Sequence, residues 1–283
     1  MKMNCTQNLL AAAFTCALAS VNIARADDAA ATPAPTATPA PAMAAPATTA
    51  DADAWNYEVS LPLWAAQING NATVGGHTAD VNVNFSELRD HLDASLALAA
   101  EAHKGKFGFF GDFGYMKFSG GFADKNGGHT DASLKFLLAN GGVSYELIKT
   151  ESEHPFVLEG TAGVRYWYAA TDLSHHNASN TKDWSGGSTY DLVDPVIGLR
   201  ASQFLTSKLH FDISGDGGGF NLNHSTDWTW SVEGLLAYDF TKWFTLSAGY
   251  QAVALDESTG SGTSQKGLNL IFSGIEVQAA FKF

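Results

Sequence analysis

Charged side chains recur in this 283-residue sequence within alternating, otherwise apolar stretches. Six of them share one face of extended segments that follow one another along the chain: Glu159, Arg165, Asp194, Arg200, Asp212 and Glu233. The same faces also carry Glu58, Glu101, His103, Asp112, Glu146, His210, Asp216, Asp239 and Glu276. Charges withdrawn from water must pair, lose their charge or stay wet. We interpret the six as an inward network of ion pairs, with a narrow cation-preferring passage as the alternative.

Hydrolytic chemistry needs a nucleophile, a histidine and an acidic group that orients the histidine. The residues of these types that could gather near one rim are Asp172, Ser174, His175, His176, Asp183, Asp194, Asp216 and His224. No motif spacing selects a triad from them. We therefore predict no catalytic residues and no enzyme, and keep a protease or lipid-modifying barrel with a rim site as the alternative.

Metal and phosphate sites have little support. His175 and His176 are adjacent, and no Cys or spaced carboxylate completes a ligand set around them. The glycine-rich run at 215–220 has no Lys or helix after it, so it does not match a phosphate loop. We predict no metal and no cofactor.

The elements that must position these side chains are strands, because polar and apolar residues alternate with period 2. Between 228 and 240, for example, Trp228, Val232 and Leu236 share one face, while Glu233 takes the other. Ten strands are predicted, at about 56–68, 93–103, 106–118, 133–146, 156–170, 190–204, 209–221, 228–240, 244–256 and 268–283.

Three features favour a closed membrane barrel over a β-sandwich. The apolar faces run longer than a usual globular strand of ~5–6 residues. Short connections alternate with long ones at 69–92, 119–132, 171–189 and 257–267, the pattern of short periplasmic turns and long extracellular loops. Aromatic residues gather at strand ends, as in the girdles at membrane interfaces. We predict a transmembrane antiparallel up-and-down β-barrel of about ten strands, with eight or twelve as alternatives.

The first predicted loop contains two candidate elements. The stretch 72–85 could form an extra hairpin that turns at Gly75 and Gly76, which would raise the count to twelve strands. The stretch 86–93 could form about two helical turns capped by Ser86.

The sequence divides into three regions. Residues 1–26 read as a secretory signal, with Lys2 before a short apolar run and an Ala-x-Ala-like site at 24–26. Both cysteines, Cys5 and Cys16, fall in this signal. Residues 27–54 are almost wholly Ala, Pro and Thr, and are predicted to be a disordered periplasmic linker. The barrel is predicted over 55–283. The formal net charge of −13 disfavours nucleic acid as a partner.

The last strand, 271–283, alternates up to a terminal Phe283 and is predicted to close the barrel against the first strand. Four stretches resemble a group of small bacterial outer-membrane barrels near the OmpA- and OmpW-like proteins, mostly of unassigned function: "HLDASLALAAEAHKGKFGFFGDFGYMKFS", "GTAGVRYWYAATDL", "DLVDPVIGLR" and "ISGDGGGF". The resemblance implies contact with outer-membrane lipids and lipopolysaccharide, and recognition by the barrel assembly machinery through Phe283. We expect a structural or surface-interaction role through the extracellular loops, with limited passage of small solutes as an addition. Both termini are expected in the periplasm.

Overall fold

The computed structural model describes residues 54–74, 76–123, 129–176, 183–222 and 224–283. The predicted signal and nearly all of the predicted linker lie outside these residues. Eleven strands are present: β1 (Asn56–Val74), β2 (His77–Val83), β3 (Leu92–Lys104), β4 (Phe107–Ala123), β5 (His129–Lys149), β6 (Phe156–His176), β7 (Trp184–Phe204), β8 (Leu209–Gly219), β9 (Trp228–Asp239), β10 (Phe244–Thr259) and β11 (Lys266–Lys282). The helix α2 (Phe85–Asp90) and a 3-10 turn, Gly262–Ser264, complete the described elements.

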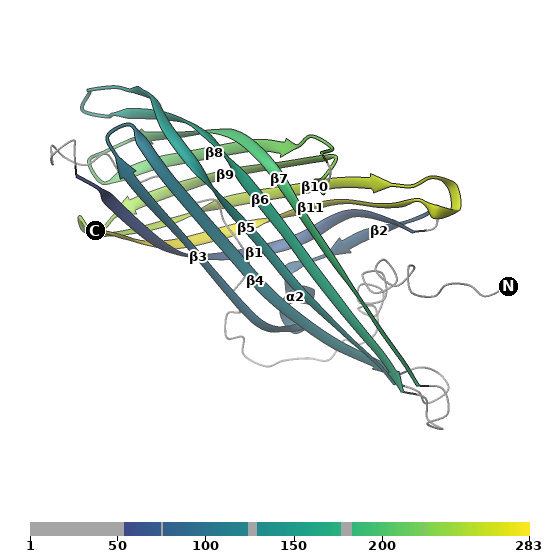
Figure 1. The fold of residues 1–283 in the computed structure, drawn as a ribbon. Helices are drawn as coiled ribbons and strands as arrows, with labels where there is room; N and C mark the ends of the chain where they lie inside the picture. The colour runs from purple at the N-terminus through teal and green to yellow at the C-terminus, as the bar shows by residue number, and fades with distance from the viewer. Residues whose placement is uncertain (1–53, 75, 124–128, 177–182, 223) are drawn as a thin grey trace.

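The strands form one closed antiparallel barrel (Figure 1). From β3 to β10, each strand pairs with the next one along the chain. The last strand, β11, pairs with β1 from Lys282 opposite Glu58 to Lys266 opposite Val74. The backbones of Tyr57 and Phe283 also exchange two hydrogen bonds. The predicted all-β antiparallel barrel and its closure by the last strand are therefore confirmed. Ten of the described strands overlap the predicted ranges and several extend beyond them, and β2 belongs to the extra hairpin of the twelve-strand alternative.

Two strands, β2 and β3, pair with the same side of β1 at different heights. We call the barrel end that holds the start of β1 and the end of β11 the lower end. The lower part of β1 pairs with β3, where Ser60 lies opposite Ala99. The upper part of β1 pairs with β2, where Ile68 lies opposite Val83. The helix α2 connects these two strands. Its N-cap is Asn84, which accepts from the backbone N–H of Glu87 at 3.0 Å. The predicted cap at Ser86 was wrong, because Asn84 and Glu87 together form a reciprocal capping box.

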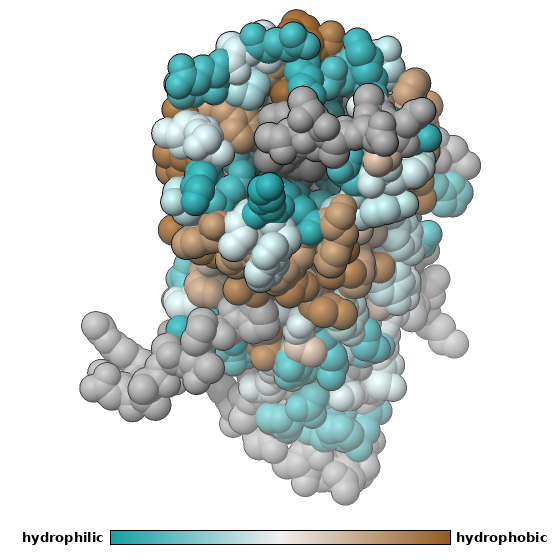
Figure 2. All heavy atoms as spheres, turned by 90° about the vertical axis from the view of Figure 1, so that its left-hand side faces the viewer, coloured by the Kyte–Doolittle hydropathy of each residue, from teal (hydrophilic) through white to brown (hydrophobic). Residues whose placement is uncertain are grey.

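An apolar belt surrounds the lower part of the barrel. Large apolar side chains face outward there, and five of them are 48–63% exposed: Leu61, Leu63, Phe107, Ile197 and Ile275. Figure 2 shows hydrophobic side chains crossing the middle of one face, between hydrophilic ones. On β1 the outward residues are apolar over 57–65 and polar from Gln67 onward. That length matches a membrane-crossing strand of about 9–11 residues.

Several strands continue far beyond this belt. β5, β6 and β7 have 21 residues each, so about half of each strand extends past the membrane. The predicted long loops at 119–132 and 171–189 are therefore shorter than expected. The outward residues of these strand ends are small or polar, such as Ser119, Asp131, Asp172 and Ser174. In a sequence, a strand face of this kind resembles a loop.

Because β8 and β9 are shorter, with 11 and 12 residues, the projecting part is divided into two sheets. One consists of β4–β7 and the other of β2, β1, β11 and β10. In Figure 1 the two sheets diverge with distance from the end that carries the C-terminus. Their inner faces are apolar close to the belt, where a buried hydrophobic cluster includes Trp64, Phe136, Trp167, Leu192 and Phe272.

Candidate functional site: the interior of the barrel

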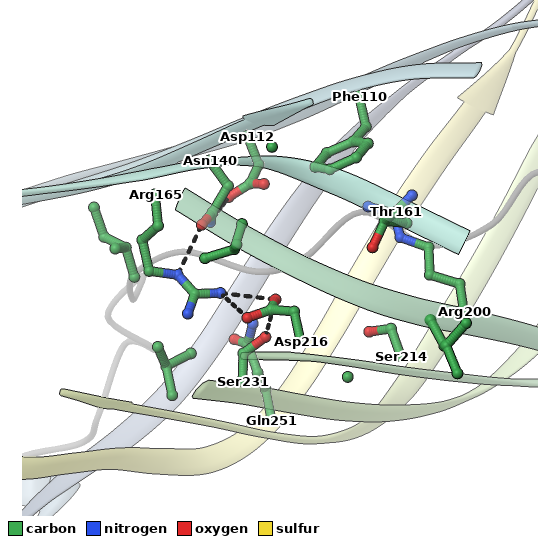
Figure 3. Close-up of a pocket in the computed structure, with 16 residues that line it drawn as sticks. Phe110, Asp112, Asn140, Thr161, Arg165, Arg200, Ser214, Asp216, Ser231 and Gln251 are labelled. Atoms are coloured by element: carbon green, nitrogen blue, oxygen red, sulfur yellow. Dashed lines mark hydrogen bonds and ion pairs between the residues drawn. The ribbon is translucent and has the colours of Figure 1, made fainter. Parts of the chain in front are cut away.

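Arg165 on β6 is the centre of a polar layer inside the barrel (Figure 3). Its side chain is almost wholly buried, with 3% of it exposed. One terminal nitrogen donates to both carboxylate oxygens of Asp216 on β8, at 2.9 and 2.8 Å. Nε donates to Asn140 on β5 at 2.9 Å, and the other terminal nitrogen donates to Thr229 on β9 at 3.0 Å. Arg165 thus ties four strands together.

A second arginine, Arg200 on β7, lies nearer the lower end. It donates to Glu101 on β3 at 2.7 Å, an ion pair that crosses the barrel. Its guanidinium carbon also lies 4.2 Å from the centre of the Phe110 ring, a cation–π distance. Glu101 is in turn 2.8 Å from His103. Charge-assisted hydrogen bonds of this kind are about twice as strong as neutral ones, so this group should hold the lower barrel rigid.

The six residues of the predicted network all lie on the inner face, each 6% exposed or less. Register places Arg165 opposite Asp194 and Arg200 opposite Glu159. The guanidinium ion pairs nevertheless form with Asp216 and Glu101. Each arginine thus lies beside one acidic residue of the network and pairs with another carboxylate further away, because an arginine side chain is long enough to reach across a narrow lumen.

The remaining members of the network bind other groups. Asp194 accepts from the backbone N–H of Thr226 at 2.7 Å and from Trp167 Nε1 at 2.9 Å. Asp212 accepts from Ser202 and lies 2.8 Å from His210 Nδ1. Glu233 interacts with Ser214 at 3.4 Å. The sequence identified the inward face of these residues but not their partners across the barrel.

The polar layer leaves little free space. The cavity bordered by Asp112, Asn140, Arg165, Asp216 and Gln251 has a volume of about 30 Å³, enough for only one or two water molecules. Above it, Phe136 stacks on Phe272 with ring centres 5.4 Å apart and meets Trp167 at 6.1 Å. Their inward positions are readable from strand alternation, but their meeting in a plug was not predicted.

The candidate catalytic residues are not assembled into a triad within the described residues. Ser174 lies on the outer side of its strand, whereas His175 is hydrogen-bonded to Thr130 at 2.8 Å. Asp194 and Asp216 are inside the barrel. His176 lies 3.5 Å from Asp183 at the tip of the β6–β7 hairpin. Among the described residues no group of three or more His, Cys, Asp or Glu could hold a metal ion.

Comparisons with known proteins show no family for this chain. No protein-family model matches the sequence. No curated protein matches it either. Similar solved structures include the outer membrane protease OmpT from Escherichia coli (8% identity, 84% of this chain and 99% of that chain, TM-score 0.46). Others are the attachment invasion locus protein Ail of Yersinia pestis (11%, 82% and 99%, 0.35) and the toluene transporter TodX of P. putida (10%, 82% and 90%, 0.28).

Closure of the ladder, an apolar outer belt and an inward polar layer occur together in this chain. The fold is that of an outer-membrane β-barrel. Lipid therefore surrounds the belt. No helix within the described residues is long and apolar enough to cross a membrane.

Proposed function

We propose that this outer-membrane barrel is closed and non-catalytic, and that it acts by binding at the cell surface through its projecting sheets. One observation carries the proposal: the interior is filled at two levels, while the strands continue far beyond the belt. The polar layer leaves about 30 Å³, and the aromatic plug formed by Phe136, Trp167 and Phe272 lies above it. Limited passage of small solutes is the second candidate, supported by the acidic lumen.

The outer face of the β4–β7 sheet offers a binding surface. A hollow of about 620 Å³ is lined there by small and polar residues: Ser119, Gly121, Asp131, Ser133, Asp172 and Ser174, with others. Hydroxyl and carboxylate groups favour a polar, hydrogen-bonding partner over an apolar one.

The orientation is part of the same proposal. The first residues of β1 and the last of β11 lie at the barrel end that has short turns, such as the one at Lys104–Phe107. Short turns are typical of the periplasmic end. The signal (1–26), the linker (27–54) and recognition of Phe283 by the assembly machinery fit this orientation, as does contact of the belt with lipid and lipopolysaccharide.

Two measurements test the function. The refolded mature protein, shown to be folded by its heat-dependent gel mobility, should give no conductance steps in a planar bilayer. Cells that express the unshortened chain should adhere or aggregate, and cells that carry a version with residues 119–132 and 172–187 replaced by short turns should not. Cation-selective steps would instead establish passage, and an unchanged surface behaviour with a folded shortened barrel would contradict the binding role.

A further inference from the structure

The barrel wall has a seam between β1 and β3. Their ladder ends where Ser60 lies opposite Ala99, and β1 next has a partner on this side at Ile68, opposite Val83 of β2. Within the described ladders, residues 61–67 of β1 and 92–98 of β3 therefore have no strand partner on the sides that face each other. Unpaired strand edges are costly at membrane depth, so the seam requires a specific cause and a cover.

Pro62 supplies the cause. Tyr57 exchanges both of its backbone hydrogen bonds with Phe283 on the β11 side. Along an antiparallel strand, the backbone N–H and C=O groups of successive residues face the two neighbouring strands in turn. The backbone groups of Glu58, Ser60 and Pro62 therefore face β3. Glu58 and Ser60 pair there, but proline has no N–H to donate. The ladder to β3 stops at this residue.

The seam opens from lipid into an apolar interior. On its outer side Leu61, Leu63 and Leu96 are 48%, 53% and 58% exposed. On its inner side Trp64 and Ala66 belong to the buried hydrophobic cluster. With both chain ends in the periplasm, as proposed above, the level of residues 61–65 is that of the outer leaflet. The molecules that meet the seam there are acyl chains.

The helix α2 covers the seam from above. Phe85 and Leu88 of α2 border an apolar pocket together with Leu92, Met116 and Trp64, among others, and the pocket has only about 20 Å³ of free space. An acyl chain can therefore enter only when these two side chains leave. None of the six residues of α2 is buried. Segments with few buried apolar contacts open at low free-energy cost, so α2 is suited to move.

Basic side chains lie beside the seam in a chain whose net charge is −13. Arg89 borders the same apolar pocket and pairs with Asp90 at 3.0 Å. Lys117 pairs with Asp93 at 3.2 Å and stands directly opposite Lys135 on the next strand. Like charges in opposite positions are destabilising. Asp93 beside Lys117, and Asp172 at 3.7 Å from Lys135, now offset this repulsion, and a phosphate could take the place of Asp93.

From these observations we infer that the seam is a binding site for one phosphate-bearing diacyl lipid. One acyl chain enters between β1 and β3 in place of Phe85 and Leu88. The phosphate lies at Arg89 and Lys117, where it replaces their present carboxylate partners. The helix α2 is the removable cover of the site.

Photo-crosslinking tests this. The mature protein is refolded into vesicles that contain a phospholipid with a diazirine near the end of one acyl chain, irradiated and mapped by mass spectrometry. We expect adducts on the inward-facing residues Ala66 and Met116. Adducts on the outward-facing residues Leu61 and Leu63 are the positive control for the reagent. Adducts on His210, a buried inward-facing residue of β8, give the background. Adducts confined to outward-facing residues would overturn the inference.

Variants separate the seam from general labelling. Pro62→Val restores a donor toward β3 and should reduce the inward adducts to background without changing those on Leu61. Pro195→Val, on β7, is the matched control and should change neither the inward adducts nor those on Leu61. Replacing Phe85 and Leu88 by Ser should increase the inward adducts. If Pro62→Val folds and leaves the inward adducts unchanged, the seam is not the route.

The headgroup contacts have their own test. Arg89→Gln with Lys117→Gln should reduce the inward adducts, whereas Lys266→Gln, at the far end of β11, should not. If the double variant and Lys266→Gln have the same amount of inward adducts, the phosphate does not bind at Arg89 and Lys117. Conductance and cell adhesion are measured separately, so this inference and the proposed function fail independently.

Discussion

Tyr190 on β7 donates a hydrogen bond to Glu257 on β10, which lies 67 residues further along the chain. The two residues belong to different projecting sheets, so this bond connects them above the membrane belt. Burial raises the pKa of the Glu257 carboxyl above its ordinary value. The connection between the two sheets therefore contains a titratable group.

The separation of the two sheets should depend on pH. The folded state keeps the proton of Glu257 up to a higher pH than the unfolded chain does, so its stabilising effect is complete below the ordinary pKa and is lost as pH rises through the raised pKa. Spin labels at the exposed positions Thr189 and Ser258 should report a longer or broader distance at higher pH. Glu257→Gln should remove this dependence. A distance that stays pH-dependent in this variant would assign the effect to another group.

Loss of Arg165 should be strongly destabilising. Arg165→Met leaves the carboxylate of Asp216 in a mostly buried position without its cation, and breaking a buried pair costs about 3–5 kcal/mol in the free energy of unfolding. Urea titration in micelles, followed by gel mobility, measures this. Lys135→Met, which breaks an exposed pair with Asp172, is the control and should cost less than about 1 kcal/mol. Similar costs for the two variants would contradict a structural role for the polar layer.

A charged residue on the outer face of the belt should lower the free energy of unfolding, whereas the same residue further along the strand should not. Leu246 and Val232 are 38% and 44% exposed on the outer face, and an arginine at either position should cost about 2–4 kcal/mol. Ser258→Arg, on the outer face of the same strand as Leu246 but beyond the belt, should be nearly neutral. Equal stability of Leu246→Arg and Ser258→Arg in vesicles would show that the belt is misplaced.

The cap of α2 should respond to Asn84 and not to Ser86. Asn84→Ala removes the acceptor for the backbone N–H of Glu87 and should destabilise the helix by about 1 kcal/mol. Faster amide exchange over residues 85–90 is the readout. The Ser86 hydroxyl donates to Asn84 Oδ1 at 2.6 Å and caps no backbone group, so Ser86→Ala should have a smaller effect. Equal exchange in both variants would contradict this capping arrangement.

Much of the fold was predictable because strand alternation is a local property of the chain. The inward position of Glu233, the outward position of Val232 and the pairing of the last strand with the first follow from period 2 and from the closure of the barrel. The projecting strands were underestimated. Their outward Ser and Asp residues face water, and nothing local distinguishes such a strand from a polar loop.

The sequence by itself determined the period of each strand, and with it which side chains face lipid and which face inward. Only the tertiary structure decided which inward groups meet. Arg165 binds Asp216 and Arg200 binds Glu101, because the curvature of the barrel, and not the separation along the chain, sets distances across the lumen. The seam has the same origin: Pro62 is visible in the sequence, but the side to which it points depends on the register with β11.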